Sequence, residues 1–259
     1  MTSGKFGRVS LFALAPLAIA SLALGGCKKE QAADPAAALA SPSAQPLAKV
    51  PAPSGKAWSE VVSVTPEGGY RMGNPDAPIK LVEFGALSCS HCAEFAKESF
   101  AKLRDDYVAS GRVSYELRLF MLNAFDIPAA MLATCGSPEA VIPLSEQFWA
   151  WQPNMFNNME KASEADRTAA GNAPPDKRFS AIAKLAGMDT FFAERGIAAD
   201  QGGRCLADVK KAESLAQQTD KYSTTYGITG TPTFYLNGAN VGSVMWAQLE
   251  PMLQNAGAR

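Results

Sequence analysis

The 259-residue sequence has few of the residues on which metal, nucleotide and nucleic-acid binding depend. One histidine and five cysteines are too few for most zinc sites. No glycine-rich loop of the G-x-x-x-x-G-K or G-x-G-x-x-G type is present, which argues against nucleotide binding. The 24 lysines and arginines are balanced by 25 aspartates and glutamates, so no broad basic surface for nucleic acid is expected. With 47% hydrophobic residues, the chain has the composition of a folded protein.

The N-terminal region has no acidic residue before Glu30 and no apolar run as long as a membrane span. Lys5 and Arg8 precede the apolar stretch Val9 to Leu24, which is interrupted by Pro16. A spanning helix needs about 20 apolar residues, so this shorter stretch favours a signal peptide over residues 1–26.

The signal peptide ends in Leu24-Gly25-Gly26-Cys27, which resembles the lipobox of bacterial lipoproteins. Cys27 would then be the lipidated first residue of the mature chain and would hold it on a membrane. The alternative is cleavage by the ordinary signal peptidase, with Cys27 incidental. Both alternatives export the protein to the periplasm or cell envelope, where paired cysteines persist.

Residues 27–57 are predicted to form a disordered linker behind this cysteine. The stretch Glu30 to Lys56 contains nine alanines, five prolines and three serines, and it has no aromatic residue. Such a segment supplies reach without a core.

The folded part is predicted to begin near Trp58 and to combine strands with helices. Runs typical of strands lie at 61–64, 79–84, 113–120, 233–236 and 239–241. Asn237-Gly238, between the last two, is a strong hairpin signal. One helical stripe has apolar residues at spacings of three and four, namely Cys92, Phe95, Ala96, Phe100, Leu103 and Tyr107. Residues 127–225 lack strand-like alternation and are expected to be helical, and a final helix starts near Met245.

Two motifs carry chemistry, and they occur in a characteristic order. The first is Leu81-Val82-Glu83-Phe84 leading into Cys89-Ser90-His91-Cys92, and the second is Gly230-Thr231-Pro232-Thr233-Phe234. Together with the order of elements, they resemble the DsbA-like thiol-disulfide oxidoreductases of the bacterial envelope. The resemblance implies an α/β thioredoxin fold with an inserted α-helical domain. The fold would be formed by residues 58–124 and 226–259, and the insertion by residues 125–225.

The cysteine pair itself predicts disulfide exchange. Cys89 would stand at a helix N-terminus, where the partial positive charge favours the attacking thiolate, and His91 beside it would favour the thiolate further. Cys92, one turn deeper, could attack a mixed disulfide at Cys89 and release the partner. The redox-active group would be the Cys89–Cys92 disulfide, without a cofactor or a metal.

Other uses of a C-x-x-C pair fit the sequence less well. Half of a zinc site would need further ligands, and the only histidine lies inside the motif. Haem attachment would need histidine directly after Cys92, where Ala93 stands. A purely structural disulfide is the third possibility, although so short a loop constrains little of the unfolded chain.

The resemblance also assigns roles to residues outside the cysteine motif. Glu83 matches the buried acid that accepts a proton from the deeper cysteine; alternatively, its side chain points to a wet edge. Pro232 matches a proline with a cis peptide bond beside the active-site sulfurs, and Thr231 would supply backbone contacts to substrate. Oxidases often have valine and isomerases threonine at the position of Thr231.

The helical block holds one further cysteine pair and an aromatic cluster. We predict a structural disulfide between Cys135 and Cys205; a second redox pair or two free thiols are the alternatives. The cluster is interpreted as core or lid packing, or as a hydrophobic substrate groove, and consists of Phe148, Trp149, Trp151 and Phe156.

We therefore expect an exported, lipid-anchored oxidoreductase that gives its disulfide to reduced exported proteins and is reoxidised by a membrane-bound partner. Nucleic acid is not expected as a partner. Two alternatives stay open. A reductase or isomerase is favoured by Thr231 and by Ser90-His91, where oxidases have Pro-His. An envelope lipoprotein that handles Cu(I) would use the two thiols and His91.

Overall fold

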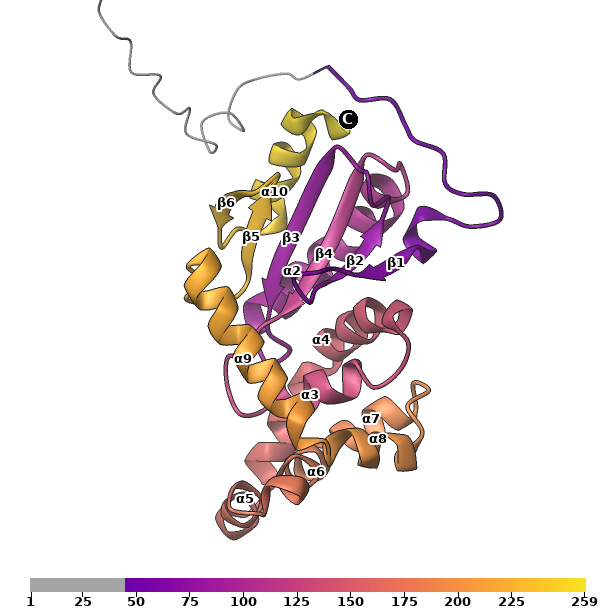
Figure 1. Ribbon diagram of the computed structural model, residues 1–259. Coiled ribbons are helices and arrows are strands. Elements are labelled where there is room, and N and C mark those ends of the chain that lie inside the picture. Colours follow the sequence, from indigo (N-terminus) through magenta and orange to yellow (C-terminus); the bar gives the residue numbers. More distant parts are fainter. Residues whose placement is uncertain (1–44) are drawn as a thin grey trace, which may run out of the picture. The chain divides into compact units, whose positions relative to one another are not determined.

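The computed structural model describes residues 45–259, which contain a six-stranded sheet with strand order β1-β2-β4-β3-β5-β6 (Figure 1). The strands are β1 Val62–Val64, β2 Tyr70–Gly73, β3 Ile79–Gly85, β4 Val113–Leu119, β5 Thr233–Leu236 and β6 Ala239–Gly242. Only β3 and β4 run parallel; the other neighbours are antiparallel. The signal peptide and Cys27 lie outside the described residues.

The central strands carry most of the burial. All seven residues of β4 are buried, and in β3 Ile79, Leu81 and Glu83 alternate with the exposed Lys80 and half-buried Val82. The parallel pair requires a crossover connection, which helix α2 Ser90–Lys102 begins and the helical turn Leu103–Val108 completes. The chain therefore leaves β3 at its carboxyl end and enters α2 through the cysteine motif.

The predicted helical block is an uninterrupted series of helices between β4 and β5. They are α3 Asp126–Ala133, α4 Pro138–Lys161, α5 Glu164–Gly171, α6 Pro175–Ala186, α7 Met188–Ala193, α8 Ala199–Leu206 and α9 Val209–Tyr226. Helix α10 Trp246–Leu253 and the turn Gln254–Ala258 follow the hairpin. Figure 1 shows α3 to α8 gathered at the end of the sheet where β3 gives way to α2.

The aromatic cluster of the helical block is mainly core. Phe148 is fully buried and lies 5.3 Å and 5.5 Å, centroid to centroid, from Phe191 and Phe192. Trp149 is buried, Trp151 is half-buried and Phe156 remains 40% exposed. The packing interpretation therefore describes this cluster, except at Phe156.

The hairpin between β5 and β6 turns at Asn237 and Gly238, as its sequence predicts. Both residues have positive φ, 51° and 84°, which this type of two-residue turn requires. The strand β2 was not predicted from the sequence. It has four residues, one of them charged and one a glycine, and it is held in the sheet by pairing with both β1 and β4.

The predicted linker is not a free tether along its whole length. Residues 45–56 contain no helix or strand, but Leu47 N–H donates to Gly257 O at 2.9 Å and Val50 N–H to Ser110 O at 3.0 Å. The indole of Trp58 donates to Val50 O at 2.7 Å. These bonds, with the half-buried side chain of Leu47, fix the end of the linker against the folded domain.

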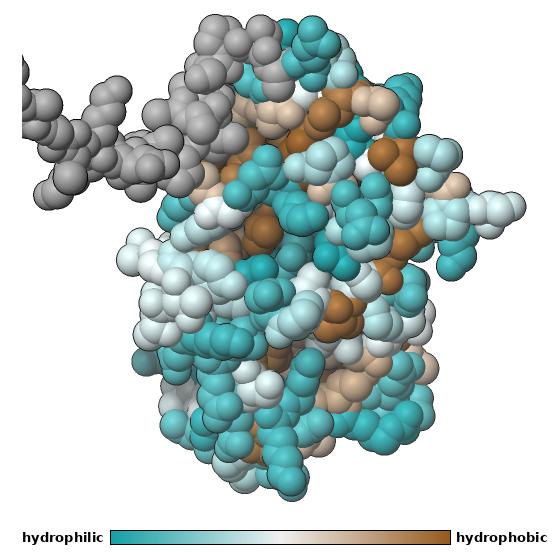
Figure 2. Space-filling view, turned by 45° about the horizontal axis from the view of Figure 1, so that its top comes forward, coloured by the Kyte–Doolittle hydropathy of each residue, from teal (hydrophilic) through white to brown (hydrophobic). Residues whose placement is uncertain are grey.

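Within residues 45–259, no helix is both long and apolar enough to cross a membrane. On the face shown in Figure 2, hydrophobic residues form separate small groups among hydrophilic ones. Four large hydrophobic residues are exposed in the described part of the chain, namely Val50, Val64, Leu122 and Phe156.

Candidate active site

Cys89 is the N-cap residue of α2. Its backbone is extended (φ −81°, ψ 118°), and its Sγ accepts a hydrogen bond from the backbone N–H of Cys92 at 3.2 Å. The sulfur thus occupies the place of the side-chain oxygen that usually caps a helix, in the field of the unsatisfied N–H groups. This is the position that the sequence predicted for the attacking thiol.

The surroundings of Cys89 favour its thiolate and lower the pKa of the thiol to about 6. The largest cause is a hydrogen bond from the Cys92 thiol; burial opposes it, and Thr231 and the backbone N–H groups of Cys92 and His91 add to it. Because the thiolate is the nucleophile in disulfide exchange, Cys89 is reactive near neutral pH.

Cys92 has the opposite character. It is fully buried, and burial together with its hydrogen bond to Cys89 raises the pKa of its thiol well above the usual value. Glu83 and Cys89 raise it further through their negative charges. The pair therefore combines one acidic, attacking thiol with one that keeps its proton, and both are free thiols in the structure.

Glu83 lies in the interior, so the wet-edge alternative is wrong for this residue. Its side chain in β3 is 1% exposed, and burial raises the pKa of the carboxyl to about 8. The hydroxyl of Tyr115, in β4, donates to Oε2 at 2.7 Å and acts against that rise. A carboxyl with such a pKa can exchange a proton near neutrality.

The second motif lies directly against the first. The Thr231–Pro232 peptide bond is cis, and the Cys89 thiol donates to Thr231 O at 3.3 Å. The Thr231 hydroxyl is buried and has no partner in the described structure while Cys89 carries its proton. It can donate to the Cys89 thiolate, which explains its lowering of the thiol pKa.

His91 has a smaller part than the sequence suggested. Its side chain is exposed, and no hydrogen bond to the ring is found among residues 45–259. What acts on Cys89 is the backbone N–H of His91. The position inside the first turn of α2, rather than the imidazole, accounts for the contribution.

Sequence reasoning missed two residues of α4 that hold the loop before Cys89. Trp149 Nε1 donates to Ala86 O at 2.9 Å, and Gln152 Nε2 donates to Leu87 O at 2.7 Å and to Cys89 O at 3.0 Å. Trp149 was seen only as an aromatic residue and Gln152 was not considered. Their spacing of three places both on one face of a helix, and this was the available signal.

Asp126, at the start of α3, was missed as well. This fully buried carboxylate accepts bonds from Ser88 N and Ser88 Oγ, at 2.7 Å and 2.9 Å, and from the backbone N–H groups of Leu122 and Asn123, each at 2.9 Å. Burial raises the pKa of Asp126, and these bonds act against the rise. The loop residues 86–89 are therefore held by the helical insertion on several sides.

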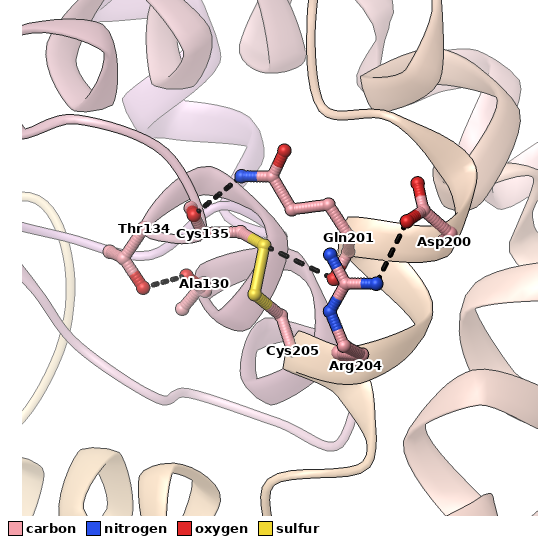
Figure 3. Close-up of a disulfide and its surroundings, with 7 residues drawn as sticks. All are labelled: Ala130, Thr134, Cys135, Asp200, Gln201, Arg204 and Cys205. Atoms are coloured by element: carbon pink, nitrogen blue, oxygen red, sulfur yellow. Dashed lines mark hydrogen bonds and ion pairs between the residues drawn. A yellow bond between two sulfur atoms is a disulfide. The ribbon is translucent and has the colours of Figure 1, made fainter.

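The remaining cysteines form the disulfide Cys135–Cys205, which joins the segment after α3 to α8, with 6.0 Å between the Cα atoms (Figure 3). Gln201 Nε2 donates to Cys135 O at 2.9 Å beside it. The alternative of two free thiols is wrong for this pair, and a structural rather than a redox role for the disulfide stays a prediction. In the part of the chain that the structure covers, no three histidine, cysteine or acidic side chains gather as a metal site.

A family model described as thioredoxin matches residues 65–255. The chain belongs to this thioredoxin family. Its expected fold, an α/β thioredoxin fold with many added helices, is confirmed by this match and by the solved structures that resemble it.

Within the thioredoxin family, one similar solved structure is a protein-disulfide isomerase from Novosphingobium aromaticivorans. It is 31% identical, with 71% of this chain and 94% of that chain covered and a TM-score of 0.67. Wolbachia pipientis alpha-DsbA1 has the same fold, with 21% identity, 74% and 92% coverage and a TM-score of 0.57.

A provisionally named protein-disulfide oxidoreductase of Rickettsia bellii is 24% identical over 167 residues. The match covers 64% of this chain and 56% of that protein. The chain thus spans about half the length of the curated relatives that it matches first.

Proposed function

We propose that this chain is an exported thiol-disulfide oxidoreductase that transfers the Cys89–Cys92 disulfide to reduced exported proteins. The observation that carries the proposal is the asymmetry of the pair. Cys89, at the N-cap of α2, has a thiol pKa of about 6, whereas the buried Cys92 retains its proton. The relatives named for disulfide chemistry support the same class of activity.

The oxidation of a substrate proceeds in two exchanges. A substrate thiolate attacks Cys89 Sγ, the Cys89–Cys92 bond breaks, and Cys92 leaves as a thiolate that takes a proton from the Glu83 carboxyl. A second substrate thiolate then attacks the substrate sulfur of the mixed disulfide, and Cys89 leaves as a thiolate. Two electrons pass from the substrate to the protein, and the substrate gains a disulfide.

The direction follows from the leaving group. Everything that stabilises the Cys89 thiolate stabilises the reduced protein and makes its disulfide more oxidising. Thr231 contributes through its buried side-chain hydroxyl, which has no partner among the described residues and can donate to that thiolate. The cis peptide bond at Pro232 leaves this backbone next to the sulfurs, where an extended substrate could pair with it.

Export, a lipid anchor at Cys27 and reoxidation by a membrane-bound partner complete the proposal. They rest on the signal peptide and the lipobox-like Leu24-Gly25-Gly26-Cys27. The protein would then act in the periplasm or cell envelope. Mass spectrometry of the mature protein tests the anchor: we expect acyl chains on Cys27, and Cys27→Ser should release the protein from membranes.

The second candidate function is disulfide reduction or isomerisation by the same Cys89–Cys92 pair. It is favoured by Thr231 and by the name of the Novosphingobium protein, a protein-disulfide isomerase. A reduction potential of about −120 mV, the value of DsbA, would support the oxidase; one of about −270 mV, the value of thioredoxin, would support the reductase.

Transfer of the disulfide to a peptide tests the proposal directly. The oxidised protein is mixed with a reduced peptide that contains two cysteines, and both are followed by acid-quenched mass spectrometry. We expect stoichiometric oxidation of the peptide, no transfer by Cys89→Ser, and an unchanged rate for Ser137→Ala on the surface. No transfer by the wild-type protein, together with tight retention of Cu(I), would favour the copper-handling alternative instead.

A further inference from the structure

Tyr115 is a buried tyrosine whose hydroxyl group serves one partner. In the sheet it lies across from Leu81 of β3, and its hydroxyl donates to Oε2 of Glu83, two residues further along that strand, at 2.7 Å. Both side chains are 1% exposed. A hydrogen bond of this length to a carboxylate, away from water, is among the stronger ones in a protein.

Among the described residues, no positively charged group acts on the Glu83 carboxyl or on the Tyr115 hydroxyl. Within residues 45–259, Tyr115 makes the only hydrogen bond to the Glu83 carboxyl. The charge of Cys89 acts on that carboxyl, and those of Cys92 and Glu146 act on Tyr115. The negative charge of the Cys89 thiolate favours the protonated carboxyl. The phenol of Tyr115 is therefore the one group of the described pocket that favours the ionised form.

The second carboxyl oxygen of Glu83 is available for proton exchange. Glu83 Oε1 is buried and has no hydrogen-bond partner among residues 45–259. It lies beside Gly85, where a Cβ would come within 3.1 Å of Oε1 and 3.2 Å of Cζ2 of Trp149. Glycine at this position, two residues towards the cysteine motif, makes room for that oxygen.

We propose that Tyr115 is a positioning residue for proton transfer at Cys92: its phenol holds Oε2 of Glu83 and leaves Oε1 to exchange a proton with the Cys92 thiol. This inference rests on the proposed function, because it concerns the same exchange reaction. It adds a residue and an atom to that reaction.

The step is balanced when the reduced protein meets a disulfide. The Cys89 thiolate attacks the disulfide, and one thiolate leaves. Oε1 then takes the proton of Cys92, the Cys92 thiolate attacks Cys89 Sγ, the Cys89–Cys92 bond forms, and the second substrate thiolate leaves. Two electrons pass to the substrate, and the proton stays on Glu83 until solvent removes it.

Tyr115 also packs in the core, so the test must separate its hydroxyl from its ring. The ring lies edge-on to Phe100, with 6.4 Å between centroids. Tyr115→Phe keeps this packing and removes only the hydroxyl. A matched control is Tyr222→Phe, because Tyr222 is also buried and its hydroxyl donates to Glu67 O, away from the cysteines.

The experiment measures the rate of the second step against pH. Each reduced variant reacts with excess glutathione disulfide, and acid-quenched mass spectrometry follows the decay of the mixed disulfide on Cys89. In Tyr115→Phe we expect the midpoint of the pH profile to move upward by about one unit, which makes the step about tenfold slower below both midpoints. Tyr222→Phe should have the wild-type midpoint.

Two further variants and one spectroscopic measurement keep the result unambiguous. When Tyr115→Phe is added to Glu83→Gln, the pH profile should not move further. In Tyr115→Phe alone, carbon NMR of the Glu83 carboxyl should show the same upward shift of the midpoint as the kinetics. An unchanged midpoint in Tyr115→Phe, with a profile that still depends on Glu83, would overturn this inference alone. If the wild-type protein forms no mixed disulfide at all, the proposed function fails instead.

Discussion

Gln152, in the helical insertion, donates a hydrogen bond to the carbonyl oxygen of Cys89, a residue 63 positions earlier in the chain. The same amide nitrogen also reaches Leu87 O. One buried side chain therefore joins the inserted helices to the N-cap residue of α2, which carries the attacking thiol.

Removal of this amide should weaken the protein. In Gln152→Leu the carbonyls of Leu87 and Cys89 lose a buried donor, and we expect a loss of about 1–3 kcal/mol in the free energy of unfolding, measured by urea titration. Gln147→Leu, in the exposed part of the same helix, should lose far less. Equal losses in the two variants would contradict a special role for Gln152.

The Cys89 thiol should titrate near pH 6. Its rate of alkylation by iodoacetamide, followed against pH in the reduced protein, should have its midpoint at about 6. Because the hydrogen bond from Cys92 is the largest cause, Cys92→Ala should move the midpoint towards 9, the ordinary value. A wild-type midpoint near 9 would remove the basis of the proposed chemistry.

The same shift has a consequence for stability. The lowered pKa of Cys89 stabilises the reduced fold fully above the pKa of the unfolded thiol, near 9, and this contribution is lost as the pH falls through about 6. Thermal melts of reduced wild type and Cys89→Ser should therefore diverge between pH 6 and 9, with the wild type gaining relative stability. Parallel curves across this range would contradict the prediction.

Glu83 should destabilise the fold at neutral pH. Its pKa is raised from 4.5 to about 8, so the folded protein retains a proton that the unfolded chain releases, and stability falls as the pH rises between these values. Glu83→Gln should therefore be more stable than wild type, by roughly 2–4 kcal/mol at pH 8 and by much less at pH 4.5. Urea titrations at both pH values measure this, and a gain that does not depend on pH would refute the linkage.

The disulfide Cys135–Cys205 should contribute to stability without supplying the reactive pair. It closes a loop with a sequence separation of 70, so removal by the double change to alanine should cost about 4 kcal/mol of unfolding free energy in the chain-entropy model. Thiol counting on the unfolded wild type after mild reduction should show two reactive thiols from Cys89 and Cys92 before the other two. Simultaneous reduction of all four would contradict this.

Local patterns in the sequence were enough for the elements that surround the cysteine motif. The helical stripe behind Cys92, the buried run around Glu83 and the Asn237-Gly238 turn depend on neighbours in the chain, and all three are found in the structure. The two cysteines and Glu83 could be located because each sits in a motif with short, fixed spacing.

The rest depends on contacts between distant segments. The strand β2 has little strand character of its own and is formed by pairing with β1 and β4. Asp126 and Gln152 are polar residues that would ordinarily be placed at the surface, and only the packed insertion shows that they are buried and bonded to the loop before Cys89. Tyr115 was indistinguishable from an ordinary strand residue until Glu83 was found beside it.

The three carbonyls held by Trp149 and Gln152 mean that the inserted helices and the cysteine motif are not separable modules. A shortened chain with residues 126–226 excised would retain the catalytic thiols in its sequence but leave Ala86, Leu87 and Cys89 without their donors. Likewise, a chimera that exchanges the insertion with that of a relative transplants part of the redox centre, so its reactivity would follow the donor of the helices as well as the donor of the cysteines.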